Sequence, residues 1–189
     1  MEATSASRIA AAQAGDERAA GELVEEFQAR IYAFLRRLVR TDADAEDLTQ
    51  RTFAQAWTSL ESFSGRSSVA SWIHGIAHHL YLDWRRADRP SEPQTDEWWA
   101  SCPAVDPTPA EIAESADLAR ALYAAVDRLD PGLRDSIHLH YYQGLTLQET
   151  ADALGTASST VKYRLRNALD QLQGILVRQP ALARRLQTF

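Results

Sequence analysis

Two histidines, His74 and His78, have the spacing in this sequence that best suits metal binding. They are four positions apart, so on a helix both imidazoles would project from one face. A protein zinc site needs at least a third ligand, and neither an HExxH motif nor a cysteine pair supplies one. We therefore expect no metal site here and interpret the pair as part of a solvated or ligand-facing surface.

Arrangements typical of catalysis are also missing from the sequence. Its Ser, His and Asp residues do not follow the order of a hydrolase catalytic triad. It also contains no P-loop glycine pattern and no obvious pair of acid and base carboxylates. Cys102 is the only cysteine, so an internal disulfide is impossible. We predict that the chain is not an enzyme and that it carries no cofactor.

Basic side chains gather near the C-terminus, although the formal net charge of the chain is -6. Residues 153–169 contain Lys162, Arg164 and Arg166 and no acid, whereas residues 91–116 contain six acids and no base. The overall charge argues against a protein that coats nucleic acid non-specifically, but it leaves room for a local basic face. Such a face could bind phosphates and the edges of bases.

The residues around this basic segment predict two short helices joined by a tight turn. Thr146 can cap a helix over 147–154 with Glu149 as its capping-box partner, and Gly155 suits the left-handed residue that ends it. Ser158 or Ser159 can cap a second helix over 160–172. Its inner side is predicted to hold Val161, Leu165, Ala168, Leu169 and Leu172.

This pattern is typical of a helix-turn-helix whose second helix enters the major groove. An ordinary helical hairpin with a solvated basic face fits the same pattern, so the segment alone leaves both interpretations open. On the first interpretation the DNA-reading residues are Ser158, Ser159, Thr160, Lys162, Tyr163, Arg164, Arg166 and Asn167.

Helical periodicity dominates the rest of the chain, strand signals are nearly absent, and the predicted fold class is all-α. An acidic, proline-rich break divides the chain into two small helical domains. Trp98 and Trp99 within the break are expected to dock on one of them. We predict a first domain over 1–90, a linker over 91–116, a second domain over 117–175 and a tail over 176–189.

Three or four helices are predicted in the first domain, of which three can be placed. The first covers 16–39, and the second follows the caps Thr41 and Asp42. On the third, a helical wheel places Val69, Trp72, Ile73, Ile76, Leu80 and Trp84 on one face and His74, His78, Tyr81 and Arg85 on the other. The second of these faces is the one that we expect to point away from the core.

Taken in order, these segments resemble bacterial sigma-70 factors of the small extracytoplasmic-function (ECF) type. The stretch DAEDLTQRTFAQAWTSLESF is similar to the part that docks on the β′ clamp of RNA polymerase, and SSVASWIHGIAHHLYLDWRRADR to the part that melts and reads the -10 element. LDPGLRDSIHLHYYQGLTLQETADALGTASSTVKYRLRNALDQL is similar to the -35-reading domain. The resemblance covers both halves of the chain, roughly 17–89 and 117–173, with a sigma region 2 bundle followed by a sigma region 4 helix-turn-helix.

The resemblance implies three sets of site residues and three partners. The polymerase-binding residues would be Asp44, Asp47, Gln50, Arg51 and Gln55. The -10-binding residues would be Arg66, His74, His78, His79, Tyr81, Arg85, Arg86 and Arg89, and the -35 set is the one given above. The partners would be core RNA polymerase, through its β′ clamp and β flap, promoter DNA, and an anti-sigma factor.

The sequence departs from the family pattern at two places. His79 stands where the family usually has asparagine, and Asn167, Ala168 and Leu169 replace a common RAR continuation, which removes two bases. We therefore expect weaker phosphate anchoring and borrow no promoter sequence from the family.

Two other classes of protein compete with this interpretation. One is a transcriptional regulator that uses the helix-turn-helix without being a polymerase subunit, and the other is an adaptor that binds partner helices. No apolar run approaches the roughly 18 residues of a membrane span, and no signal-peptide plan opens the sequence. We expect no membrane insertion and a cytoplasmic protein.

Overall fold

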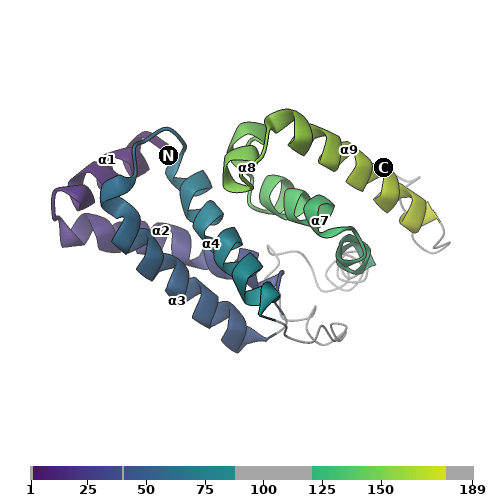
Figure 1. Cartoon of the computed structure of the whole chain (residues 1–189), viewed down its shortest axis with the longest axis horizontal. Coiled ribbons are helices and arrows are strands. Elements are labelled where there is room, and N and C mark those ends of the chain that lie inside the picture. The colour runs from purple at the N-terminus through teal and green to yellow at the C-terminus, as the bar shows by residue number, and fades with distance from the viewer. Residues whose placement is uncertain (1, 40, 88–120, 178–189) are drawn as a thin grey trace, which may run out of the picture. The chain divides into compact units, whose positions relative to one another are not determined.

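The computed structural model describes residues 2–39, 41–87 and 121–177 (Figure 1). All regular elements in these ranges are helices, which confirms the all-α prediction. The chain divides into two compact units: residues 1–90 with 138–162, and residues 91–137 with 163–189. The predicted linker with Cys102, Trp98 and Trp99, residue Arg89, and the tail from 178 onward lie outside the described residues.

The first unit begins with a helix that the sequence analysis did not predict, α1 (Glu2–Gln13). It lies against α2 (Glu17–Arg36), with Ile9 and Ala12 buried in the core of the unit. The Arg8 guanidinium binds two carboxylates of α2, Glu22 at 3.0 Å and Glu26 at 2.7 Å. Ion pairs and modest apolar burial therefore hold α1 in place.

The next helix, α3 (Asp42–Ser59), continues into the short 3-10 helix η1 (Leu60–Ser62). Thr41 is the N-cap of α3, as predicted, because its hydroxyl accepts a hydrogen bond from the Asp44 backbone N–H. Leu48 and Ala56 face the core, and the buried hydroxyls of Thr49 and Thr52 donate to carbonyls one turn earlier.

The long helix α4 (Val69–Arg86) is capped by Ser68, whose hydroxyl accepts from the Ser71 backbone N–H. Side chains are buried on more than one side of it: Val69, Ser71, Ile73, His74, Ala77, His78, Leu80 and Tyr81. A helix with this burial has neighbours on more than one side, so only part of it lies on the surface of the unit.

The neighbours of α4 include residues from the C-terminal half that belong to the same unit. A π-helical turn, η2 (His138–Tyr142), precedes α8 (Leu147–Ala153). Leu139, Leu145 and Ala153 join the apolar core formed by α1 to α4. A Cβ at Gly75 of α4 would lie 3.5 Å from the Cα of Ala153, so the two helices approach closely there.

The second unit contains a helical stretch over 121–127 and α7 (Pro131–Ile137). Pro131 is the first residue of α7, a position where a proline costs no hydrogen bond. The last described helix is α9 (Ser158–Val177), whose residues from Tyr163 onward belong to this unit.

Candidate nucleic-acid and polymerase interfaces

The predicted recognition helix, α9, separates apolar from polar side chains almost as its wheel indicated. Val161, Leu165, Ala168 and Leu172 are buried. The prediction was wrong for Leu169, which is 46% exposed. Ser159, Lys162, Tyr163 and Arg166 are exposed, whereas Ser158, Thr160, Arg164 and Asn167 are half-buried.

The outward side chains of α9 have the chemistry that major-groove reading requires. Lys162 and Arg166 are one helical turn apart, so both can reach one side of a duplex. Between them Tyr163 is 67% exposed and offers an aromatic ring with a hydroxyl. Arg164 is half-buried and lies against α7 instead. Its guanidinium carbon would be 3.4 Å from a Cβ placed at Gly132.

The predicted capping box forms at the N-terminus of α8, the first helix of the helix-turn-helix. The Thr146 hydroxyl accepts from the Glu149 backbone N–H at 3.2 Å, and the Glu149 carboxylate accepts from the Thr146 N–H at 2.8 Å. Gly155 has φ +60°, the left-handed conformation that ends α8. The predicted serine cap of the next helix was wrong, since α9 already includes Ser158 at its first position.

Four of the predicted -10 residues lie on exposed surface. Arg66 is exposed in the loop before α4, and its Nε donates to the Ser64 hydroxyl at 3.1 Å. His79, Arg85 and Arg86 are exposed on α4. Asp83 lies among them, 3.5 Å from His79 and 3.2 Å from Arg86, so this surface is basic but partly neutralised.

Three others are buried, so the prediction that they face away from the core was wrong. His74, His78 and Tyr81 pack inside the first unit, and the ring centroids of His74 and Phe34 are 5.6 Å apart. The wheel failed because α4 has neighbours in two directions: Phe34 of α2 packs on His74, and residues 138–153 join the same core. Whether these three residues contact DNA stays a prediction, since they are covered in this structure.

Burial also fixes the charge of His74. Its Nδ1 lies 2.7 Å from the Ala70 carbonyl, which can only accept, so Nδ1 carries the proton. Burial lowers the pKa of His74 from 6.5 to about 4, and the nearby Arg30 charge acts in the same direction. At neutral pH His74 is therefore an uncharged core residue that could not attract a phosphate.

The predicted polymerase-binding residues share the outer part of α3. Asp47, Gln50, Arg51 and Gln55 are exposed, and Asp44 is half-buried beside the Thr41 hydroxyl. A hollow of about 510 Å³ adjoins them between α2 and α3. Its lining includes residues that sequence reasoning missed: Glu25, Gln28, Ala29, Tyr32, Glu46 and Thr49.

The charged side chains that line this hollow, Glu25 and Glu46, are both acidic. The Tyr32 hydroxyl donates to Asp42 at 3.2 Å, and partial burial, together with that carboxylate, raises the Tyr32 pKa. Lys and Arg side chains of a partner would complement the Glu25 and Glu46 carboxylates. The signal in the sequence was the acid-rich start of α3, but the contribution of α2 depends on how the two helices pack.

Towards its C-terminal end, the side of α3 that faces α2 is apolar. Trp57 is 53% exposed beside a small cavity of about 40 Å³. Leu23, Val24, Phe53 and Ile73 are among the side chains that line it. The groove between α2 and α3 thus carries acids near the start of α3 and apolar side chains near its end.

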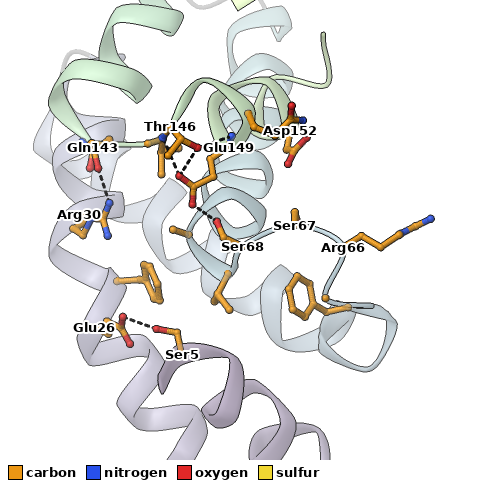
Figure 2. A pocket seen from close by; sticks show the side chains of 18 residues that line it. Ser5, Glu26, Arg30, Arg66, Ser67, Ser68, Gln143, Thr146, Glu149 and Asp152 are labelled. Atoms are coloured by element: carbon orange, nitrogen blue, oxygen red, sulfur yellow. Dashed lines mark hydrogen bonds between the residues drawn. The ribbon is translucent and has the colours of Figure 1, made fainter. Parts of the chain in front are cut away.

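A larger hollow of about 1030 Å³ opens beside the loop that leads into α4 (Figure 2). Figure 2 shows the Glu149 carboxylate between two hydroxyls, that of Ser68 at 2.5 Å and that of Thr146 at 2.8 Å. The Ser71 hydroxyl donates to the Glu149 carbonyl at 2.8 Å. Arg30 of α2 donates to the Gln143 carbonyl at 2.6 Å, so α2 is also hydrogen-bonded to the 138–153 segment.

Within the described ranges, no cluster of three or more His, Cys, Asp or Glu side chains could hold a metal ion. His74 and His78 are both buried, and His74 uses Nδ1 in its own helix. No helix in the described part of the chain has the length and apolar character needed to cross a bilayer.

Comparisons with known proteins match both halves of the chain to one family. The family model Sigma-70 region 2 matches residues 23–90, and the model Sigma-70, region 4 matches residues 119–172. The chain is 33% identical over 159 residues to the ECF RNA polymerase sigma factor RpoE of Cereibacter sphaeroides, covering 84% of this chain and 86% of that protein. It is 34% identical over 158 residues to ECF RNA polymerase sigma factor SigE of Mycolicibacterium smegmatis, covering 83% of this chain and 61% of that longer protein.

Solved structures share the fold at lower sequence identity. CnrH, solved in complex with the cytosolic domain of CnrY, aligns with a TM-score of 0.70 at 22% identity, covering 93% of this chain and 99% of that one. The sigma factor RpoE of Bartonella quintana, solved with the anti-sigma factor NepR, aligns with a TM-score of 0.61 at 20% identity, covering 82% and 95%.

A helix-turn-helix alone would also suit a repressor or activator. This chain carries in addition a region 2 match over the helices that bear the acidic hollow and the basic end of α4, upstream of the region 4 match. The two regions occur in that order, and a third of the aligned residues are identical to those of a relative of similar length. The chain therefore belongs to the ECF sigma factors of the sigma-70 family.

Proposed function

We propose that this protein binds core RNA polymerase and directs it to start DNA-templated transcription at specific promoters. The observation that carries the proposal is the presence, in one chain and in this order, of region 2 over 23–90 and region 4 over 119–172. The exposed Lys162, Tyr163 and Arg166 support it, because they give the second region a face suited to duplex DNA.

In this proposal the polymerase-binding surface is the outer part of α3 with the acidic hollow beside it. Asp47, Gln50, Arg51 and Gln55 would contact the β′ clamp, and Glu25 and Glu46 would add negative charge around them. The region 4 domain would contact the β flap and place α9 on the -35 element. The domain boundaries stay as proposed from the sequence: 1–90, 91–116, 117–175 and 176–189.

The -10 element would meet the exposed Arg66, His79, Arg85 and Arg86. Guanidinium groups bind phosphates and stack on unpaired bases, which suits a strand that has been opened. Arg85 lies with its guanidinium carbon 5.5 Å from the centre of the Tyr81 ring, an arrangement that limits its rotamers.

Regulation would come from an anti-sigma factor, the kind of partner that the Bartonella quintana structure contains. The protein would act in the cytoplasm, where polymerase and promoters are. It would add no catalytic group of its own, since the chemistry of RNA synthesis would belong to the core enzyme.

Reconstitution with core RNA polymerase tests the proposal. Transcription of a fragmented genomic library by core enzyme with the protein, followed by mapping of the RNA 5′ ends, should give discrete start sites that core enzyme alone lacks. Specific binding of duplex DNA by the protein without core enzyme, and no new start sites with it, would instead identify a helix-turn-helix regulator.

Co-purification tests the surface on α3. Asp47→Ala and Gln50→Ala should lower retention of the protein on immobilised core enzyme. Glu61→Ala removes an exposed acid in η1, outside this surface, and serves as the matched control. Equal retention of all three variants and the wild type would exclude the assignment.

A further inference from the structure

The helix α1 lies upstream of the region 2 match, which begins at residue 23, yet its last residue contacts the loop that carries Arg66. The Gln13 side-chain amide donates two hydrogen bonds to backbone carbonyls 47 and 50 positions later. One goes to Leu60 at 2.9 Å and the other to Phe63 at 3.0 Å. Both acceptors lie at the start of the loop between α3 and α4.

The position of Gln13 is itself fixed by the packing of α1. Ile9 and Ala12 are buried in the core of the unit. Arg8 binds Glu22 and Glu26, and the buried Ser5 hydroxyl donates to Glu26 at 2.7 Å (Figure 2). The amide at the end of this helix is therefore presented by a rigid element.

The loop also has internal hydrogen bonds: the Ser62 hydroxyl donates to the Ser59 carbonyl at 2.7 Å, and the Arg66 Nε to the Ser64 hydroxyl at 3.1 Å. The Phe63 N–H donates to the Leu60 carbonyl at 3.1 Å, so Gln13 binds the same carbonyl that closes this turn. The Phe63 ring packs on Trp72 of α4, with 4.7 Å between ring centroids. After Gly65, at φ +70°, the chain reaches the exposed Arg66 and then Ser68, the N-cap of α4.

We propose that Gln13 is a positioning residue for promoter recognition: it fixes the 60–68 loop and thereby the place of Arg66 and the start of α4. Gln13 itself does not touch DNA. This inference rests on the proposed function, because Arg66 is assigned there to the -10 element. It makes α1 part of the -10-reading apparatus of this protein, although α1 lies outside the region that the family model matches.

The test uses three variants of the full-length protein. Gln13→Glu keeps the shape of the side chain but replaces the donating amide with a carboxylate, which repels both carbonyls. Gln13→Lys restores a donor. Ala14→Glu is the matched control, because it adds the same charge at the same helix end on an exposed residue that accepts no loop contact.

Hydrogen exchange on the free protein measures the loop directly. In Gln13→Glu, exchange across residues 60–68 should become roughly three- to tenfold faster, since two modest hydrogen bonds are lost. Gln13→Lys and Ala14→Glu should stay within about twofold of the wild type by the same reasoning. Unchanged exchange in Gln13→Glu would overturn the proposal.

Transcription with reconstituted holoenzyme measures the consequence. With template libraries randomised at the -10 or at the -35 element, Gln13→Glu should alter the preferred -10 bases and slow open-complex formation roughly three- to tenfold. Preference at -35 and affinity for core enzyme should not change, a pattern that general destabilisation would not produce. Faster exchange across residues 60–68 in Gln13→Glu, together with an unchanged -10 preference, would overturn the role assigned to Gln13.

The two proposals fail in different ways. If wild-type holoenzyme starts no specific transcription, the proposed function fails, whereas the exchange experiment still reports whether Gln13 holds the loop.

Discussion

The two helices expected to read promoter DNA, α4 and α9, are buried in different ways. On α9 the core side is continuous, and Lys162, Tyr163 and Arg166 project outward. On α4 the core side extends to His74 and Tyr81, and exposed bases remain mainly at the C-terminal end. A helix with neighbours on one side obeys its wheel, whereas a helix covered from two directions does not.

The largest effect on the free energy of unfolding is expected from a charge placed at position 74. His74→Arg would bury a cation near Arg30 in the core, and we expect a loss of roughly 3 kcal/mol or more in the free energy of unfolding. His79→Arg, on the exposed side of the same helix, should change it by less than about 0.5 kcal/mol. Urea unfolding of both variants measures the difference, and equal stability would show that position 74 is open to water.

The second-largest effect is the expected change in the free energy of unfolding with pH. Between about pH 6.5 and pH 4 the unfolded chain binds a proton at His74 that the folded protein excludes. The free energy of unfolding should therefore fall as the pH drops through this window, by about 3 kcal/mol at its lower end. Urea unfolding at several pH values should show a shallower dependence for His74→Gln, but the wild-type dependence for His79→Gln.

Removal of bases from α9 should affect promoter use without affecting stability. Lys162→Ala or Arg166→Ala should each weaken transcription from a promoter that needs its -35 element by roughly 5- to 150-fold, or about 1–3 kcal/mol. Gln173→Ala, exposed near the end of the same helix, is the control. Run-off transcription measures the effect, and an unchanged -35 preference would assign the face to solvent or to another partner.

The smallest effect is expected at the basic end of α4. Arg86→Ala should weaken open-complex formation about threefold at all promoters alike and lower its salt dependence by about one phosphate contact. Arg18→Ala on α2, where the side chain is 88% exposed, should have no such effect. If Arg86→Ala changed sequence preference instead, the residue would be reading bases.

Local signals in the sequence predicted the starts of α3 and α8. The Thr146–Glu149 capping box and the Thr41 cap depend on residues three positions apart, so the local sequence is enough to predict them. The inner side of α9 followed from spacing for the same reason, apart from Leu169 near its edge.

The features that the sequence did not predict depend on contacts between distant residues. The helix α1 has a single large apolar residue, Ile9, and is held by ion pairs from Arg8 to α2. His74 packs on Phe34 of α2 and lies near Gln143 and Glu149, about 70 positions later in the chain. The acidic hollow between α2 and α3 likewise combines residues that no single-helix pattern relates.

One carboxylate serves two helix starts. Ser68 is the N-cap of α4 and Thr146 is the N-cap of α8, and both hydroxyls donate to the same side chain, Glu149. A negative charge there also lies near the positive ends of two helix dipoles. Substitutions at Glu149 are therefore pleiotropic: in a genetic screen they would score as promoter-recognition defects, although the residue has been assigned no base or phosphate.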